Sequence, residues 1–314
     1  MWATSSGRDW RIEMEEIGEI LGRGFGVWKS NLNLCIPFLL SIMATMAIAV
    51  PFTAAISSIL LSPESLNGLN ATTLQNETAL NDLLEQMAGS LESLPADRIL
   101  MAAGLFFALM ILISLADAFF TAGAIGMAKK AQEDGRTDMR DMWSAGRSHF
   151  KRLFLANLAI GLIIMAGLIF LLPALAMNPQ IQPENTQSMG LLAAGFLLFI
   201  FYALASSVVF AAAPYALVLE NLGAWQAISA SIKFFRYNKF DVTVLWLVVV
   251  ALSIGLEMIG SAVPMGSGAA GKNFPFITNL IDLLVLYPLF NLWWTRLYMN
   301  RKGMNSTVEV NDPW

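Results

Sequence analysis

Charged residues are scarce in this sequence. Only 13% of its 314 residues are Asp, Glu, Lys or Arg, and 56% are apolar, whereas a soluble domain carries about 25% charged residues. A soluble globule of this size cannot hide so much apolar surface and still cover itself with charge. The composition therefore excludes an ordinary cytosolic protein, a disordered chain and a nucleic-acid binder with a basic face, and it indicates an integral membrane protein.

Cysteine and histidine are almost absent. The single Cys excludes an internal disulfide, and the single His, His149, argues against a histidine metal site. A Ser-His-Asp triad would have to be built around His149, and no Ser stands in a nucleophile-elbow context. We therefore predict a protein that is not an enzyme and that holds no cofactor or metal.

Six long apolar runs are present. A helix needs about 20 residues to cross a hydrocarbon core of roughly 30 Å, and each run is at least that long. The runs do not alternate apolar and polar residues as strands of a membrane barrel do, so they predict a helix bundle. The predicted spans are Leu34–Leu61, Ile99–Met127, Leu153–Met177, Met189–Leu219, Phe240–Val263 and Phe274–Met299.

The basic residues are sorted between the two sides of this bundle. All of the 19 Lys and Arg residues except Arg98 and Lys272 fall on the side that holds both termini. Because cytoplasmic loops are enriched in Lys and Arg, we expect both termini to be cytoplasmic, in the cell membrane. An acidic stretch precedes the first span, which argues against a cleaved signal peptide.

The organisation that follows is one membrane domain over residues 1–314. It includes a cytoplasmic amphipathic segment (1–33), an extracytoplasmic loop (62–98) and a cytoplasmic tail (300–314). The outer loop carries two glycosylation sequons, at Asn70 and Asn76. Leucines at helical spacing within this loop predict an amphipathic helix, and a disordered loop is the alternative.

A motif recurs ahead of spans one, three and five. Each copy places an aromatic residue before a basic one, and each follows an amphipathic stretch with apolar residues at spacings of three and four. Two copies have Asn at the fourth place. The copies are Trp28-Lys29-Ser30-Asn31, Phe150-Lys151-Arg152-Leu153 and Phe235-Arg236-Tyr237-Asn238. This pattern predicts three repeats, although aromatic-basic pairs also occur at any inner membrane boundary.

Each repeat would consist of one cytoplasmic interfacial helix followed by two spans. The aromatic residues Trp28, Phe150 and Phe235 would anchor at headgroup depth, while Lys29, Lys151 and Arg236 reach lipid phosphates. Because each unit has an even number of spans, the three repeats are parallel. The predicted fold is an all-α, polytopic bundle of six transmembrane helices in three parallel two-span repeats.

The arrangement of these motifs resembles a known group. Six spans with aromatic-basic amphipathic segments before spans one, three and five resemble a family of uncharacterised prokaryotic membrane proteins, archaeal by its acidic balance. The family is similar to the membrane domain of glycerophosphodiester phosphodiesterases. The segment 224–238, AWQAISASIKFFRYN, carries the local match. The soluble catalytic domain of those enzymes has no counterpart here, so the resemblance implies no phosphodiesterase activity.

Three carboxylates lie within the spans. A charge at bilayer depth is costly, so Asp117, Glu257 and Asp282 are candidate functional residues. Glu257 and Asp282 would approach one another if spans five and six form a hairpin, and Asn291 adds to a polar stripe on span six. The alternative is that each carboxylate is neutral or hydrogen-bonded to a neighbouring helix. Trp293, Trp294 and Tyr298 predict an aromatic belt at the inner end of span six.

Two functions remain open. The first is a non-enzymatic protein that organises the membrane by binding lipid or a membrane protein partner, without nucleic acid. The second is a small transporter or permease component that uses the intramembrane carboxylates. Three interfacial helices and the lack of a catalytic set favour the first function.

Overall fold

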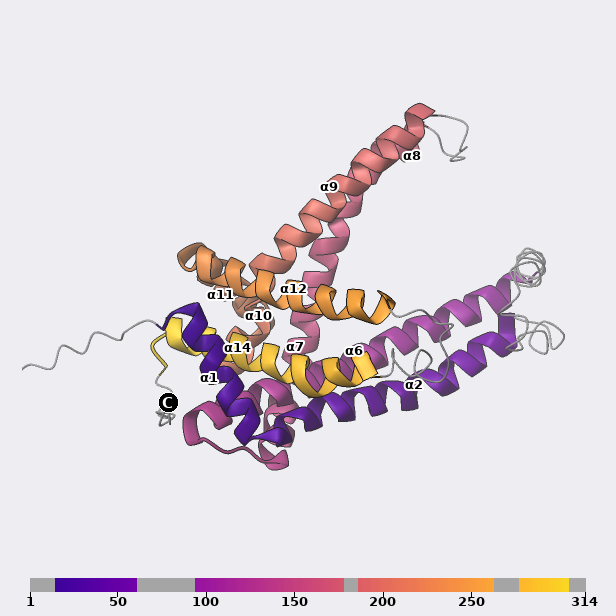
Figure 1. Ribbon diagram of the computed structural model, residues 1–314. Coiled ribbons are helices and arrows are strands. Elements are labelled where there is room, and N and C mark those ends of the chain that lie inside the picture. Colours follow the sequence, from indigo (N-terminus) through magenta and orange to yellow (C-terminus); the bar gives the residue numbers. More distant parts are fainter. Residues whose placement is uncertain (1–14, 61–93, 178–185, 263–276, 305–314) are drawn as a thin grey trace, which may run out of the picture. The chain divides into compact units, whose positions relative to one another are not determined.

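The computed structural model describes residues 15–60, 94–177, 186–262 and 277–304, and every regular element within these ranges is helical (Figure 1). The predicted all-α class is confirmed. The longer helices are α1 (Ile17–Ser30), α2 (Ile36–Leu60), α6 (Ala96–Asp134), α7 (Met139–Ala166), α9 (Thr186–Phe210), α11 (Ala224–Tyr237), α12 (Lys239–Ala262) and α14 (Tyr287–Arg301). Shorter elements are α8 (Leu172–Met177), α10 (Ala213–Leu219), the 3-10 turns η1 (Leu32–Cys35) and η2 (Gly167–Leu171), and a π-helical turn η3 (Asp282–Leu286).

Six of the helical stretches are long and apolar enough to cross a membrane, as the sequence predicts. Most of their residues remain accessible at the surface, and large apolar side chains such as Phe107, Phe201 and Met258 are exposed. Apolar surface of this kind suits a lipid environment. The stretches are Leu32–Leu60, Ala96–Asp134, Met139–Ala174, Met189–Leu219, Lys239–Gly260 and Ile277–Arg301.

The chain divides into two compact units. Unit 2 consists of residues 40–117 and contains most of α2 and the first part of α6. Its exposed side chains include Met43, Val50 and Phe106. Unit 1 consists of residues 1–39 and 118–314, and it contains all the remaining elements.

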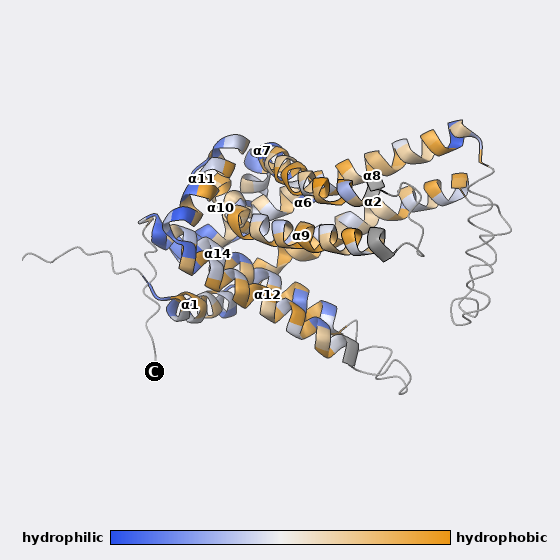
Figure 2. Cartoon of the chain, turned by 90° about the horizontal axis from the view of Figure 1, so that it is seen from above, coloured by the Kyte–Doolittle hydropathy of each residue, from blue (hydrophilic) through white to orange (hydrophobic). Residues whose placement is uncertain are grey.

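The core of unit 1 is built from the ends of the even-numbered spans. Every residue of α14 from Pro288 to Met299 is buried, and α6 from Ala118 to Gln132 and α10 contribute further buried side chains. Hydrophilic residues of unit 1 gather where α1, α11 and the end of α14 lie (Figure 2). The most buried part of unit 1 is therefore close to its polar end.

Two of the three amphipathic stretches form separate helices, α1 and α11. The second stretch differs from the expectation of a separate interfacial helix, because residues 139–150 run without a break into the third span as helix α7. The physical reason is the residue at the fourth place of the motif. Leu153 continues the helix there, whereas Asn31 and Asn238 end theirs.

Candidate functional site

The three amphipathic stretches begin with the same backbone contact. In each, the N–H of the residue before the first turn is accepted by the side chain three residues later, as in a capping box. The accepting side chains stand at the same distance before the aromatic residue of the motif. The pairs are Glu16 and Glu19 at 3.3 Å, Asp138 and Asp141 at 3.0 Å, and Gly223 and Gln226 at 3.1 Å.

The first and third stretches also end in the same way. The side-chain amide of Asn31 donates to the carbonyl of Val27 at 3.1 Å, and that of Asn238 donates to the carbonyl of Phe234 at 3.1 Å. These carbonyls belong to the last helical turn, where intrahelical partners run out. The Asn therefore ends the helix, α1 or α11, and the chain turns into the next helical stretch.

At the middle of each stretch a small buried residue faces an even-numbered span. Gly24 lies against Trp293 of α14, and Gly146 lies against Phe119 of α6. The hydroxyl of Ser231 donates to the carbonyl of Val209 in α9 at 2.7 Å. Each stretch thus packs on the second span of a different pair, in cyclic order: the first on span six, the second on span two and the third on span four.

A residue with left-handed backbone conformation follows each even-numbered span. Gly135, Asn221 and Gly303 are the three residues with positive φ, at 75°, 55° and 66°, in the described part of the chain. A helix commonly ends with such a residue at its C-terminal side. Asn31 donates to the carbonyl of Gly135 at 3.0 Å, and Arg152 donates to the carbonyl of Asn221 at 3.1 Å. These contacts tie the turns at Gly135 and Asn221 to a neighbouring motif.

A buried ion pair joins the chain's N-terminal region to its last span. Arg296 donates two hydrogen bonds to the carboxylate of Glu15, one from Nε and one from a terminal N–H₂ group, each at 2.7 Å. The Arg296 side chain is 2% exposed. Arg23 contacts the same carboxylate at 2.8 Å, and Arg301 donates to the backbone carbonyl of Glu15 at 2.8 Å. Burial raises the pKa of Glu15, but the two guanidinium groups outweigh it and hold the pKa below its ordinary value.

A second charged cluster lies around Glu220, just after α10. Its carboxylate accepts from the hydroxyl of Tyr298 and pairs with the Lys302 ammonium at 2.8 Å. Burial raises the pKa of Glu220, and these two partners lower it by more, so the pKa lies below its ordinary value. Both clusters therefore keep ionised carboxylates around the end of α14.

The first motif is also joined to the π-helical turn of span six. Pro288 has no N–H, so it cannot donate to the carbonyl of Leu284 as an α-helical residue would. The indole of Trp28 donates to that carbonyl at 3.2 Å, and the thiol of Cys35 reaches it at 3.0 Å. Trp28, predicted as a headgroup anchor, thus directs its polar atom into the protein.

The aromatic and the basic residues among the six predicted anchors differ in exposure, in the same way in all three motifs. The aromatic residues Trp28, Phe150 and Phe235 are half-buried, and the basic residues Lys29, Lys151 and Arg236 are exposed. Phe150 packs against Phe119, at 6.2 Å between ring centroids. The sequence could not show that the aromatic member serves packing while the basic one remains accessible.

The predicted intramembrane residues lie on different elements and differ in exposure. Asp117 is an exposed residue of unit 2, Glu257 is exposed on α12, and Asn291 is buried in α14. Asp282 is half-buried in η3. No group of three or more His, Cys, Asp or Glu residues that could hold a metal occurs in the described ranges.

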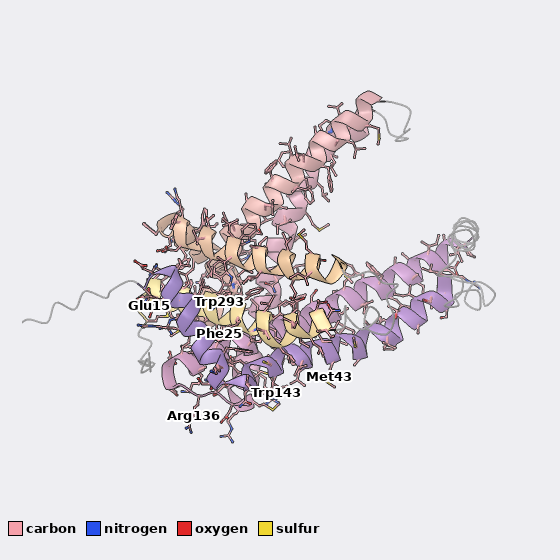
Figure 3. All side chains as sticks on the ribbon, in the orientation of Figure 1. Glu15, Phe25, Met43, Arg136, Trp143 and Trp293 are labelled. Carbon is pink, nitrogen blue, oxygen red and sulfur yellow. The ribbon has the colours of Figure 1, made fainter. Side chains whose placement is uncertain are left out.

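Some predictions made from the sequence are wrong. Trp293, Trp294 and Tyr298 are not an aromatic belt facing lipid, because all three are buried (Figure 3 shows Trp293 on α14). Trp293 donates to the carbonyl of Leu21 at 3.1 Å. Arg296, predicted as a basic residue accessible on the inner side, is instead buried and paired with Glu15. The only sign of its burial in the sequence is that span six is less apolar than the other spans. Asn70, Asn76, most of the predicted outer helix, residues 1–14 and residues 305–314 lie outside the described residues.

Comparison with known proteins now gives a family. The family described as a domain of unknown function, DUF7847, matches residues 79–287. The chain belongs to this family. A relative from Archaeoglobus fulgidus, titled "Uncharacterized protein", is 24% identical over 304 residues, which cover 94% of this chain and 98% of the relative. No solved structure matches. DUF7847 and this relative support the archaeal, uncharacterised family expected from sequence, whereas the likeness to phosphodiesterase membrane domains stays a prediction.

Proposed function

We propose that this DUF7847 protein is a non-enzymatic, multi-pass protein of the cell membrane, with both termini in the cytoplasm. It consists of three parallel repeats, each with an amphipathic stretch and two spans. It organises the inner leaflet by binding lipid along these stretches. The observation that carries the proposal is the recurrence of one capping contact and one exposed basic residue in all three stretches.

The cyclic packing supports three equivalent repeats. Each stretch contacts the second span of another pair through a small residue at the same place in the motif, namely Gly24, Gly146 or Ser231. Such a ring brings the N-terminal segment, the two predicted inner loops and the end of α14 to one end of unit 1. The ion pair of Glu15 with Arg296 and the contact of Lys302 with Glu220 hold these segments together.

Physical chemistry favours lipid as the ligand of this end. Exposed Lys29, Lys151 and Arg236 beside apolar helix faces suit the phosphate level of a leaflet, where each cation near an anionic surface contributes about 1 kcal/mol. The continuous helix α7 would place Lys151 at the point where the span enters the bilayer. The predicted resemblance to the membrane domain of glycerophosphodiester phosphodiesterases agrees with a lipid-facing role.

The test is the fraction of spin-labelled lipid that the reconstituted protein immobilises. We expect K29Q/K151Q/R236Q to lower the immobilised fraction of phosphatidylglycerol without changing that of phosphatidylcholine. K129Q/K130Q/R136Q is the control, since Lys129 and Lys130 already pair with Glu133 and Asp134 one turn along α6. An equal loss in both variants would mean a general charge effect, and no loss in either would refute lipid organisation.

A transporter is the second candidate, favoured by the π-helical turn at Asp282. Single π-helical turns occur frequently at functional sites. The double variant E257Q/D282N separates the two functions. Lipid organisation requires that it fold and immobilise lipid normally, whereas a loss of proton- or cation-coupled uptake in vesicles would establish transport.

A further inference from the structure

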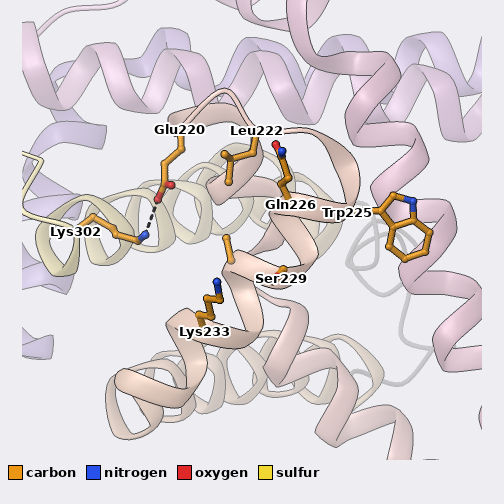
Figure 4. A pocket seen from close by; sticks show the side chains of 8 residues that line it. Glu220, Leu222, Trp225, Gln226, Ser229, Lys233 and Lys302 are labelled. Atoms are coloured by element: carbon orange, nitrogen blue, oxygen red, sulfur yellow. Dashed lines mark ion pairs between the residues drawn. The ribbon is translucent and has the colours of Figure 1, made fainter.

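A groove of about 520 Å³ lies between α11 and the end of α14 in unit 1 (Figure 4). One side is a stripe on α11 formed by Trp225, Ser229 and Lys233, which recur at one-turn intervals. The other side holds Lys302 and Glu220. A volume of several hundred Å³ is typical of a small-molecule site. The groove opens to the surface beside Trp225, which is 72% exposed.

The polar groups around the groove are mainly donors. Lys302 is held by Glu220 at 2.8 Å, which occupies one of the three donors of its ammonium. Lys233 is exposed and pairs with no carboxylate within 4.0 Å among the described residues. Gln226 uses its carbonyl oxygen to cap α11, which leaves its amide N–H₂ group for another acceptor. With two ammonium groups and one carboxylate, the groove has a net positive charge.

The stripe of Trp225, Ser229 and Lys233 has no counterpart in α1. The three equivalent places in α1 are occupied by Gly18, Gly22 and Gly26, and a Cβ at any of them would meet nothing within 4 Å. Trp, Ser and Lys at the same places of α11 therefore serve no packing need of the motif. Their side chains add a large apolar ring, a hydroxyl and a cation to one surface.

We propose that this groove binds the phosphate of one anionic lipid, with Lys233 and Lys302 at the phosphate and Trp225 beside the glycerol and upper acyl chain. The inference deepens the proposed function and rests on it, because α11 must lie at the inner leaflet. Trp is favoured at the level of lipid headgroups, and Lys contacts phosphate as a point charge. Ser229 and Gln226 supply further donors between the two lysines.

Glu220 has a defined part in this site. Because its pKa lies below its ordinary value, it stays ionised and keeps the Lys302 ammonium at the rim of the groove. The same carboxylate repels a phosphate that approaches the far side of Lys302. The phosphate is therefore expected on the Lys233 side, where the positive charge has no carboxylate partner.

The experiment counts bound lipid on the purified full chain by native mass spectrometry in an uncharged detergent. Short-chain phosphatidylglycerol is the probe, phosphatidylcholine of equal chain length tests the charge, and glycerol phosphate tests the headgroup without chains. We expect one saturable phosphatidylglycerol per chain and an about tenfold weaker affinity in K233Q, the loss of one charge-assisted contact. S229Y, which fills the groove and keeps both lysines, should weaken binding as well.

Lys239→Gln is the matched control, since it removes one exposed cation at the start of α12, outside the groove and outside the three aromatic-basic motifs. Equal losses in K239Q and K233Q, or no loss in K233Q and S229Y, would overturn the groove. Binding of glycerol phosphate as tight as that of the lipid would assign the site to a soluble phosphate ester instead. If the triple variant K29Q/K151Q/R236Q binds less lipid while K233Q binds it normally, lipid binding in the groove is refuted and the proposed function stands. If K233Q binds less lipid while the triple variant binds it normally, lipid binding along the three stretches is refuted and the groove stands.

Discussion

The indole N–H of Trp28 donates to the backbone carbonyl of Leu284, 3.2 Å away and 256 residues along the chain. That carbonyl precedes Pro288 by one helical turn, and Pro288 has no N–H to offer it. Helix α1 thus supplies a hydrogen bond that the last helix, α14, lacks. An unpaired carbonyl in an apolar environment is costly, so this contact joins the first and last parts of unit 1.

Replacing Trp28 by Phe should destabilise the protein by about 1 kcal/mol, the usual net value of one hydrogen bond. Cys35 still reaches the same carbonyl, which keeps the loss from being larger. Thermal unfolding in detergent measures the effect. Trp143→Phe is the control, because Trp143 is 43% exposed and contacts Phe119 through its ring. Equal destabilisation by both changes would contradict a role for the Trp28 N–H.

Alanine at Gly24 should destabilise the protein by about 1–3 kcal/mol, as overpacking does. Its Cβ would overlap the Trp293 ring, which is itself buried and cannot move freely. At Gly26, on the same helix, a Cβ meets nothing within 4 Å, so Gly26→Ala should instead stabilise α1 by about 0.5–1 kcal/mol. The unfolding midpoints of the two variants give the comparison, and a midpoint shift of the same sign would show that α1 does not pack on α14 through Gly24.

Arg296→Met should cost about 3 kcal/mol or more, because it leaves the buried carboxylate of Glu15 without its main partner. Arg23→Met removes the second partner of the same carboxylate, but the Arg23 side chain is 47% exposed, and we expect a loss of about 0.5 kcal/mol. Denaturant unfolding of both variants tests this order. Similar losses for the two arginines would mean that burial of Arg296 adds nothing to the pair.

Acid should weaken the contact between Glu220 and Lys302. The folded-state pKa of Glu220 lies below its ordinary value of 4.5, so the folded protein binds the proton less readily than the unfolded chain. The contribution of Glu220 to stability is therefore complete above pH 4.5 and is lost as the pH falls through the folded-state pKa. In Glu220→Gln the decline of the unfolding midpoint below pH 4.5 should be shallower than in the parent. Identical pH profiles would show that this carboxylate gains nothing from Lys302 and Tyr298.

Much of the helical organisation can be read from the residues themselves. Long apolar runs form helices in any apolar solvent, because only helices satisfy every backbone group within one segment. The six spans are therefore local properties of the chain. The Asn at the fourth place of the motif is local as well: it ends α1 and α11, and its replacement by Leu153 lets α7 continue.

The candidate site depends on contacts that sequence patterns do not contain. Arg296 and Trp293 resemble residues of an inner membrane boundary, yet both are buried by segments far along the chain. The groove beside Lys233 requires Lys302, which lies beyond another complete pair of spans. Hydropathy describes the preference of a residue for water or an apolar environment. It carries no information about which polar group binds the residue when it is buried.

The sequence by itself determined the class of this protein, the number of its spans and the sorting of its basic residues, since each follows from the cost of placing charge in hydrocarbon. Only the tertiary structure decided that the end of α14 is a buried core rather than a lipid-facing belt. It also decided that Glu15 pairs with Arg296 and that Trp28 covers the carbonyl before Pro288. These are long-range pairings, set by how the helices pack, and no local pattern specifies them.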